Sequence, residues 1–306
     1  MKCKKIITKL FIVALFVCVL SGCGEKEEKK QTDFVMPEGQ VYVFDTFQTN
    51  DGAYFNDNGI LKYRDKESKK EVIVSSEPDK TGENEKNPAY IGMMGEVFVH
   101  KDTLYAIDKD MSNMKVRIIK SDLDRSHREE IYCAEGMMQM FTYVRMGDSI
   151  YSFVSGPVAE TNKETGVQEY KGKGKSLLLQ IDLKNQTVKE TKLMLEGDSG
   201  EAFIMGADKE YIYYAMTEVL DGQYTTTFRR ISTKKAIVDK GEEILKVTGK
   251  RTAGSYYEDN HIVYRLMEKD NSLGEIKSYD MKTKTTEELK ASEEINFKLD
   301  HQGREK

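Results

Sequence analysis

The sequence has no tryptophan, few cysteines, no long apolar run and no excess of positive charge. The lack of tryptophan disfavours a platform for stacking carbohydrate, although 17 tyrosines could take its place. Its 47 basic residues are outnumbered by 52 acidic ones, so the basic footprint of a nucleic-acid-binding protein is missing. The apolar run from Leu10 to Leu20 is too short to span a bilayer, which needs about 20 such residues.

The N-terminus instead contains an export signal. Lysines precede the apolar run, as in the positively charged n-region of a secretory signal peptide. The run ends at Leu20-Ser21-Gly22-Cys23, an aliphatic residue, two small residues and a cysteine. This stretch resembles the lipobox of bacterial lipoproteins. Cys18 does not fit that box, because bulky Phe16 and Val17 precede it.

The resemblance implies that the signal peptide, residues 1–22, is cleaved between Gly22 and Cys23 and that Cys23 carries a diacylglyceryl group. Residues 23–39 are then the acylated cysteine and a flexible tether, and residues 40–306 form the folded domain. The acyl chains make the lipid bilayer the first partner. A lysine-rich, arginine-poor composition favours a Gram-positive source, where such a protein sits on the extracytoplasmic face of the cell membrane.

Only one cysteine, Cys133, lies beyond the lipobox. With Cys23 acylated, an intrachain disulfide is excluded even though export would permit one. We expect Cys133 to be buried as a small hydrophobic residue, and stability to come from burial of apolar surface.

Short segments with alternating apolar and polar residues recur along the chain, separated by polar turns, which is typical of strands. A turn entering a strand appears at Asp51–Tyr54, Asp102–Tyr105 and Asp148–Tyr151, with looser copies ending at Tyr213 and Tyr264. A strand that ends in a charged turn alternates with it, in the same order, five times. We therefore predict an all-β fold, a β-propeller-like array of about five four-stranded repeats, similar to domains of Gram-positive surface lipoproteins. A β-sandwich or irregular all-β array is the alternative.

Three predictions concern the details of this array. The second repeat should hold strands at about 96–100, 103–108, 114–121 and 129–133. Polar segments 77–88 and 155–175 should be loops, the second one protruding between strands. The segment 294–306 should begin a partial sixth repeat, either completing the ring beside residues 41–47 or belonging to a longer array.

Two methionine-rich segments each precede the first strand of a repeat, where a propeller places residues near its central channel. We hypothesise that Met93, Met94, Met137, Met138 and Met140 line one mouth of the channel. Soft thioethers there could hold copper(I) or an adaptable apolar ligand. Packing between neighbouring sheets is the alternative. The four histidines are scattered without metal-ligand spacing, so neither a metal nor a cofactor is otherwise expected.

The sequence contains no motif that pairs a nucleophile with a base. We therefore predict a non-enzymatic binding or scaffolding module for another envelope protein, a peptide or a glycan. One alternative is a propeller hydrolase or lyase with a channel-mouth site, which clustering of His100, Arg145, Glu258 or acidic residues in one concave pocket would favour. The other is a methionine-rich metal-handling protein.

The lipobox predicts the effect of one substitution. Cys23→Ala removes the only thiol that can be acylated at the cleavage site, so the protein should leave the membrane fraction or accumulate as an uncleaved precursor. Fractionation and immunoblotting of expressing cells measure both effects. Unchanged processing and membrane association would contradict the lipoprotein assignment.

Overall fold

A computed structural model describes residues 36–301, apart from positions 81, 83–85, 111, 138, 162–167, 199–200, 221–222 and 269. The signal peptide, Gly22, Cys23 and most of the tether lie outside the described residues. The described residues form mostly strands, and the one α-helix among them is α2 (Glu293–Asp300). No helix within these ranges is both long and apolar enough to cross a membrane.

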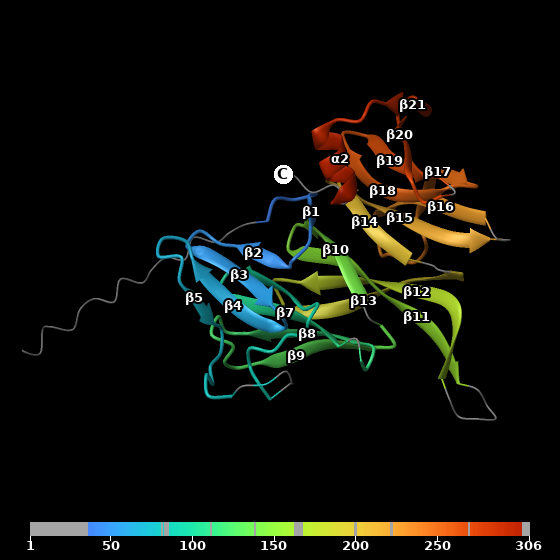
Figure 1. Ribbon diagram of the computed structural model, residues 1–306. Coiled ribbons are helices and arrows are strands. Elements are labelled where there is room, and N and C mark those ends of the chain that lie inside the picture. The colour runs from blue at the N-terminus through green and yellow to red at the C-terminus, as the bar shows by residue number, and fades with distance from the viewer. Residues whose placement is uncertain are drawn as a thin grey trace, which may run out of the picture. The chain divides into compact units, whose positions relative to one another are not determined.

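Five antiparallel sheets follow one another along the chain (Figure 1). The first two sheets contain β2 (Thr46–Gln48), β3 (Gly52–Asp57), β4 (Ile60–Asp65) and β5 (Glu71–Ile73), then β6 (Glu96–His100), β7 (Thr103–Asp110), β8 (Lys115–Ser121) and β9 (Glu129–Glu135). The third contains β10 (Gln139–Met146), β11 (Ser149–Thr161), β12 (Gln168–Asp182) and β13 (Thr187–Asp198), with β1 (Val41–Tyr42) paired to β10. The last two contain β14 (Glu201–Ala207), β15 (Tyr211–Leu220), β16 (Gln223–Ser232) and β17 (Glu242–Thr248), then β18 (Arg251–Glu258), β19 (His261–Met267), β20 (Leu273–Asp280) and β21 (Thr285–Leu289).

Within each sheet the four main strands lie in sequence order. A four-stranded antiparallel meander repeated in this way is the blade of a β-propeller, so the predicted all-β propeller fold is confirmed. The strands of the second sheet begin and end within two residues of the positions expected from the repeat.

The period-two alternation explains how neighbouring sheets pack. Successive side chains of a strand point to opposite faces of its sheet. In β10, Tyr143 joins a core shared with the first and second sheets, whereas Val144 joins a core shared with the fourth. In β15, Tyr214 faces the third sheet and Tyr213 faces the fifth. The third and fourth sheets are thus buried on both faces, and β15 accordingly carries consecutive apolar residues from Tyr211 to Met216.

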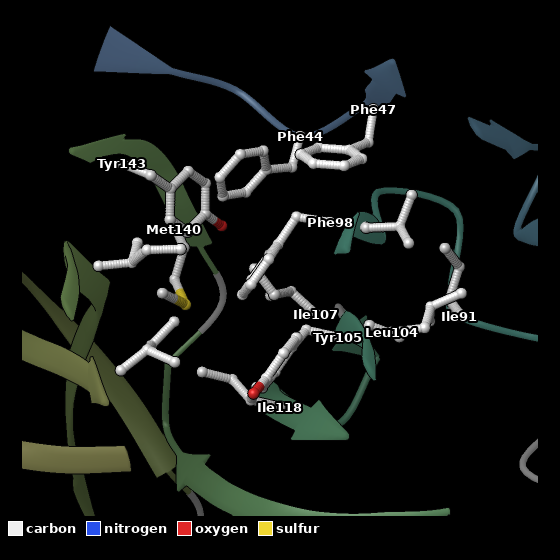
Figure 2. Close-up of a cluster of buried hydrophobic side chains, with 14 of the residues drawn as sticks. Phe44, Phe47, Ile91, Phe98, Leu104, Tyr105, Ile107, Ile118, Met140 and Tyr143 are labelled. Atoms are coloured by element: carbon white, nitrogen blue, oxygen red, sulfur yellow. The ribbon is translucent and has the colours of Figure 1, made fainter. Parts of the chain in front are cut away.

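Aromatic rings fill the core between the first three sheets, as Figure 2 shows. The ring of Phe44 is central: its centroid lies 4.5 Å from that of Tyr143 and 4.9 Å from that of Phe98. Phe98 in turn stacks on Tyr105 at 4.6 Å. Phe44 precedes β2, so a residue of the N-terminal segment holds together side chains from several sheets.

The N-terminal segment, residues 36–45, also bonds to those sheets through its backbone. The carbonyl of Phe44 accepts a hydrogen bond from the amide of Val97 in the second sheet (2.8 Å). Gly39 donates to the carbonyl of Arg145 in the third sheet (3.1 Å) and accepts from the amide of Ala207 in the fourth (2.9 Å). The four residues from Met36 to Gly39, which the sequence suggested were tether, therefore contact the folded sheets.

Gly39 is required at this crossing for two reasons. Its φ of +80° is a conformation that side-chain-bearing residues rarely adopt. A Cβ there would also lie only 2.5 Å from the carbonyl oxygen of Ala207. Glycine thus permits the close approach of the N-terminal segment to the fourth sheet.

The predicted strand of a sixth repeat is wrong, because residues 293–300 form α2 instead. Ser292 caps this helix by accepting a hydrogen bond from the amide of Ile295, and two acidic residues follow in the first turn, where the helix dipole favours them. Ile295 and Leu299, four residues apart, lie on one helix face and pack on the fifth sheet. The helix therefore covers a face that a sixth sheet would otherwise bury.

The sheet register corrects one further expectation and decides one alternative that the sequence left open. Strand pairing in the β11–β12 hairpin continues as far as Thr161 and Gln168, so most of the predicted loop at 155–175 is a hairpin. Residues 41–42 pair with β10 rather than with the C-terminal segment. The polar segment 77–88 does lie between the first and second sheets, as expected.

The position of Phe44 predicts a large loss of stability on truncation. Phe44→Ala should lower the free energy of unfolding by about 3–5 kcal/mol, because it leaves a cavity among closely packed rings. Urea unfolding followed by tyrosine fluorescence measures the change. Val72→Ala is the control, since Val72 is 56% exposed and its truncation should cost no more than about 0.5 kcal/mol. Similar losses in the two variants would contradict the central role of Phe44.

Candidate functional site

Two cavities are bordered by the N-terminal segment. The tyrosine-lined cavity, of about 630 Å³, is bounded by Tyr211, Tyr256 and Tyr257. The methionine-lined cavity, of about 420 Å³, is bounded by Met93 and Met94. Residues 38–41 line the first cavity, and Val43 and Asp45 line the second, so one short stretch of chain contributes to both.

The hairpin between β14 and β15 forms one wall of the tyrosine-lined cavity. One carboxylate oxygen of Asp208 accepts hydrogen bonds from the backbone amides of Glu210 (2.8 Å) and Tyr211 (2.7 Å). The other accepts from the hydroxyl of Tyr213 at 2.7 Å. Partial burial favours the protonated acid, but these bonds hold the pKa of Asp208 below its ordinary value. Asp208 is therefore a charged brace that fixes the turn.

The hairpin between β18 and β19 forms the facing wall. Tyr257 stacks on Tyr213 with ring centroids 3.6 Å apart and planes inclined by 9°. Gly206, with φ of +155°, lies against Tyr257, and a Cβ at that position would sit 3.2 Å from the Tyr257 carbonyl. Burial, together with the carboxylates of Asp208 and Asp259, raises the pKa of Tyr257. The wall is thus closely packed and carries negative potential.

Cations already contact two of the cavity tyrosines. The ammonium of Lys298, from α2, lies 2.7 Å from Glu258 and 5.8 Å from the ring centroid of Tyr256. The guanidinium of Arg230 lies 4.5 Å from the ring centroid of Tyr211. Both distances fall within the range of cation–π attraction.

A tight turn presents the exposed methionines of the second cavity. The side-chain amide of Asn56 donates to the carbonyls of Gly92 (2.8 Å) and Gly95 (2.7 Å), and so ties the turn to β3. Met93 and Met94 occupy its tip and are 61% and 47% exposed. The turn geometry therefore places both thioethers at the surface.

A buried ion pair lies at the wall of this cavity. Lys109 and Glu96 are 2.9 Å apart and almost fully buried. The hydroxyl of Tyr143 donates to Glu96, and Lys109 also donates to the carbonyl of Met140 at 2.6 Å. Burial raises the pKa of Glu96, against the stabilising effect of Lys109 and Tyr143 on its carboxylate. These hydrogen bonds join the second sheet to β10, which gives the pair a structural role.

The five methionines suggested by the sequence do not form one group. Met93 and Met94 line a cavity, but Met137 and Met140 are buried in the core of the first three sheets, where Figure 2 labels Met140. Met138 lies outside the described residues. Copper(I) binding stays a prediction. Of the four candidate methionines that the structure describes, Met93 and Met94 line this cavity, together with His301.

Of the groups named for a catalytic alternative, acidic residues gather in the tyrosine-lined cavity, but His100 and Arg145 do not join them. Glu258 lines the tyrosine-lined cavity, whereas neither His100 nor Arg145 lines either cavity. The guanidinium of Arg145 instead donates to the carbonyls of Met36 and Gly147. Among the residues placed by the structure, no three histidine, cysteine or acidic side chains gather to hold a metal ion.

Cys133 is exposed on β9, so the expectation that it is buried is wrong. Cys133 points to the exposed face of the edge strand β9, whereas the next residue, Ala134, points to the buried face. The sequence alone does not show which of the two faces is buried. Partial burial of the thiol and the neighbouring Glu130 raise the pKa of Cys133, which disfavours the reactive thiolate.

The tyrosine-lined cavity was missed by sequence reasoning. Tyr211, Tyr256 and Tyr257 do not occupy the tyrosine position of the recurring turn before each strand, so nothing in the repeat selects them. The available signal was the combination of tyrosine and acidic residues beside two hairpin turns, at 208–211 and 256–260. Nothing local indicated that these two turns and α2 would border one cavity.

No protein-family model matches the chain, and no curated protein matches it. Solved structures of similar fold include an oligogalacturonate lyase in complex with manganese, at 10% identity and a TM-score of 0.48, over 86% of this chain and 70% of that one. An oligogalacturonate lyase from Vibrio parahaemolyticus gives 11% identity and a TM-score of 0.44, over 83% and 66% of the two chains. The β-propeller domain of the Trilobed protease from Pyrococcus furiosus gives 10% and 0.31, over 83% and 86%. The sheet topology of this chain defines its class, an all-β propeller protein.

Proposed function

We propose that this protein is a lipoprotein anchored on the extracytoplasmic face of a cell membrane, and that its propeller binds a ligand in the tyrosine-lined cavity. The ligand is a group presented by another envelope component, whether a protein, a peptide, a glycan or a lipid. The single observation that carries the binding role is a cavity of about 630 Å³ with three tyrosines in its wall.

The lipobox at Leu20–Cys23 supports the anchor. Acyl chains on Cys23 would hold the protein on the bilayer, and no polybasic cluster is then needed. The folded domain begins within about 13 residues of Cys23 along the chain, since Met36 is already buried among the sheets. The anchor would therefore keep the propeller near the membrane surface.

The rigidity of the cavity supports binding. Asp208 fixes one hairpin through three hydrogen bonds, and the Tyr213–Tyr257 stack ties that hairpin to the facing one. A wall that is already ordered loses little conformational entropy when a ligand binds. Its volume lies within the range of small-molecule sites, and its mixture of apolar rings and polar groups is typical of them.

Binding is favoured over the catalytic alternative by the placement of the titratable groups. Acidic residues gather in the tyrosine-lined cavity with Glu258, but neither His100 nor Arg145 joins them there. Within the tyrosine-lined cavity, Asp208 and Glu258 are engaged by Tyr213 and Lys298. A general base needs to reach a substrate proton directly. These carboxylates instead brace the wall.

The proposal predicts that substitutions in the cavity abolish capture of the ligand. The tagged full chain is crosslinked in cells, purified from solubilised membranes, and its co-purifying molecules are identified by mass spectrometry. Tyr257→Ala should reduce capture of a specific species at least about tenfold, because it removes an aromatic contact surface from the wall.

Tyr224→Ala is the matched control, because Tyr224 is 42% exposed on β16 and does not line the cavity. Glu258→Gln is a second cavity variant with almost unchanged shape, and thermal unfolding of all variants confirms that they fold. Equal capture by the parent protein, the control and both cavity variants would exclude the cavity as the binding site.

A further inference from the structure

We propose that the ligand of the tyrosine-lined cavity carries an ammonium group, which binds against Tyr257 and the carboxylates around it. This inference rests on the proposed binding function and names the chemical class of the ligand. It follows from the charges that line the cavity and from the cations that its tyrosines already contact.

The lining of the cavity is negative. Five acidic side chains border it, Glu38, Asp208, Glu210, Glu258 and Asp259, against two basic ones, Lys209 and Lys298. Each exposed pair of charges contributes little, but charges of one sign lining a concave surface add to a common potential. A cationic group is therefore favoured over a neutral or anionic one.

Lys298 shows how this environment holds an ammonium. Its side chain is only 12% exposed, and its ammonium lies 2.7 Å from Glu258 and 3.1 Å from Glu294. Partial burial alone would lower the pKa of Lys298, but the two carboxylates outweigh it and raise the pKa above its ordinary value. The wall thus keeps a partly buried ammonium charged, with the ring of Tyr256 close by.

Arg230, on β16, gives a second instance beside the β14–β15 hairpin. Its guanidinium lies over Tyr211 and is paired with Glu242 at 2.6 Å. Tyr257 is the third cavity tyrosine, and it is half-buried and backed by Tyr213. Asp208 and Asp259 act on the Tyr257 hydroxyl electrostatically, which places Tyr257 in the same negative field. The ammonium of a ligand would then contact Tyr257 in the way that Lys298 contacts Tyr256 and Arg230 contacts Tyr211.

An ammonium can come from a free amine or from a lipid headgroup. Glu38 in the cavity wall is fifteen positions beyond Cys23, and an extended chain of that length reaches at most about 54 Å. With Cys23 acylated, the cavity stays within that distance of the bilayer, so both sources are accessible.

The test uses the full chain purified in detergent micelles, with choline as the probe and 3,3-dimethylbutan-1-ol as its uncharged isostere. Calorimetric titration should show choline binding at least about tenfold more tightly than the isostere, because only choline carries the charge. Tyr257→Leu, which keeps an apolar side chain but removes the ring, should weaken choline binding at least about tenfold, whereas Tyr224→Leu should not.

Mixed micelles distinguish the two sources. Displacement of choline by mixed micelles of the detergent with phosphatidylcholine, but not with phosphatidylglycerol, assigns the site to a lipid headgroup. Displacement by neither assigns it to a free amine.

Equal binding of choline and the isostere, or no choline binding up to about 50 mM, would overturn the inference. In either case the crosslinking experiment still decides the broader proposal. Tyr257-dependent capture of another molecule would leave the binding function standing with a different ligand class. Capture that is independent of Tyr257 would remove both.

Discussion

The N-terminal segment, residues 36–45, is the constraint on which the arrangement of the sheets depends. A propeller sheet is held to its neighbours mainly by side-chain packing, which is non-directional. This segment adds directional bonds, because its backbone pairs with Val97, Arg145 and Ala207 in three different sheets before it enters β2 of the first. The ring of Phe44 then fills the core between the first three sheets. Four of the five sheets are therefore linked by ten residues, and the fifth is completed by α2.

The candidate site also depends on the contacts of the N-terminal segment with the sheets. The contact of Gly39 with Ala207 places residues 38–41 beside the hairpin that Asp208 braces. The stack of Tyr257 on Tyr213 places the β18–β19 hairpin of the fifth sheet against the fourth sheet, and α2 contributes Lys298. The cavity is thus built from segments that meet only when the sheets, the N-terminal segment and the helix are all in place. A site of this kind links the ligand to the stability of the whole array, because a ligand that binds only the folded state stabilises it.

Much of the fold was predictable, because it is encoded locally. Alternating side chains and a recurring turn before each strand determine where strands begin, as the second sheet shows. The C-terminal segment was misread because Ile295, Phe297 and Leu299 alternate as in a strand, while the capping Ser292 and the spacing of Ile295 and Leu299 satisfy a helix equally well. Packing against the fifth sheet decides between the two. The role of residues 36–39 and the tyrosine-lined cavity depend on contacts between distant segments, which leave no pattern along the chain.

Native-state hydrogen exchange at the amides of Val97 and Ala207 tests most directly whether the N-terminal segment links the sheets. Both donate to the N-terminal segment, one beside the core ring of Phe44 and the other beside the tyrosine-lined cavity. If the segment is a single link between the sheets, the two amides should exchange through a common opening, with equal opening free energies close to that of global unfolding. Exchange of Ala207 through a separate opening, orders of magnitude faster than that of Val97, would show that the segment does not hold the cavity in place.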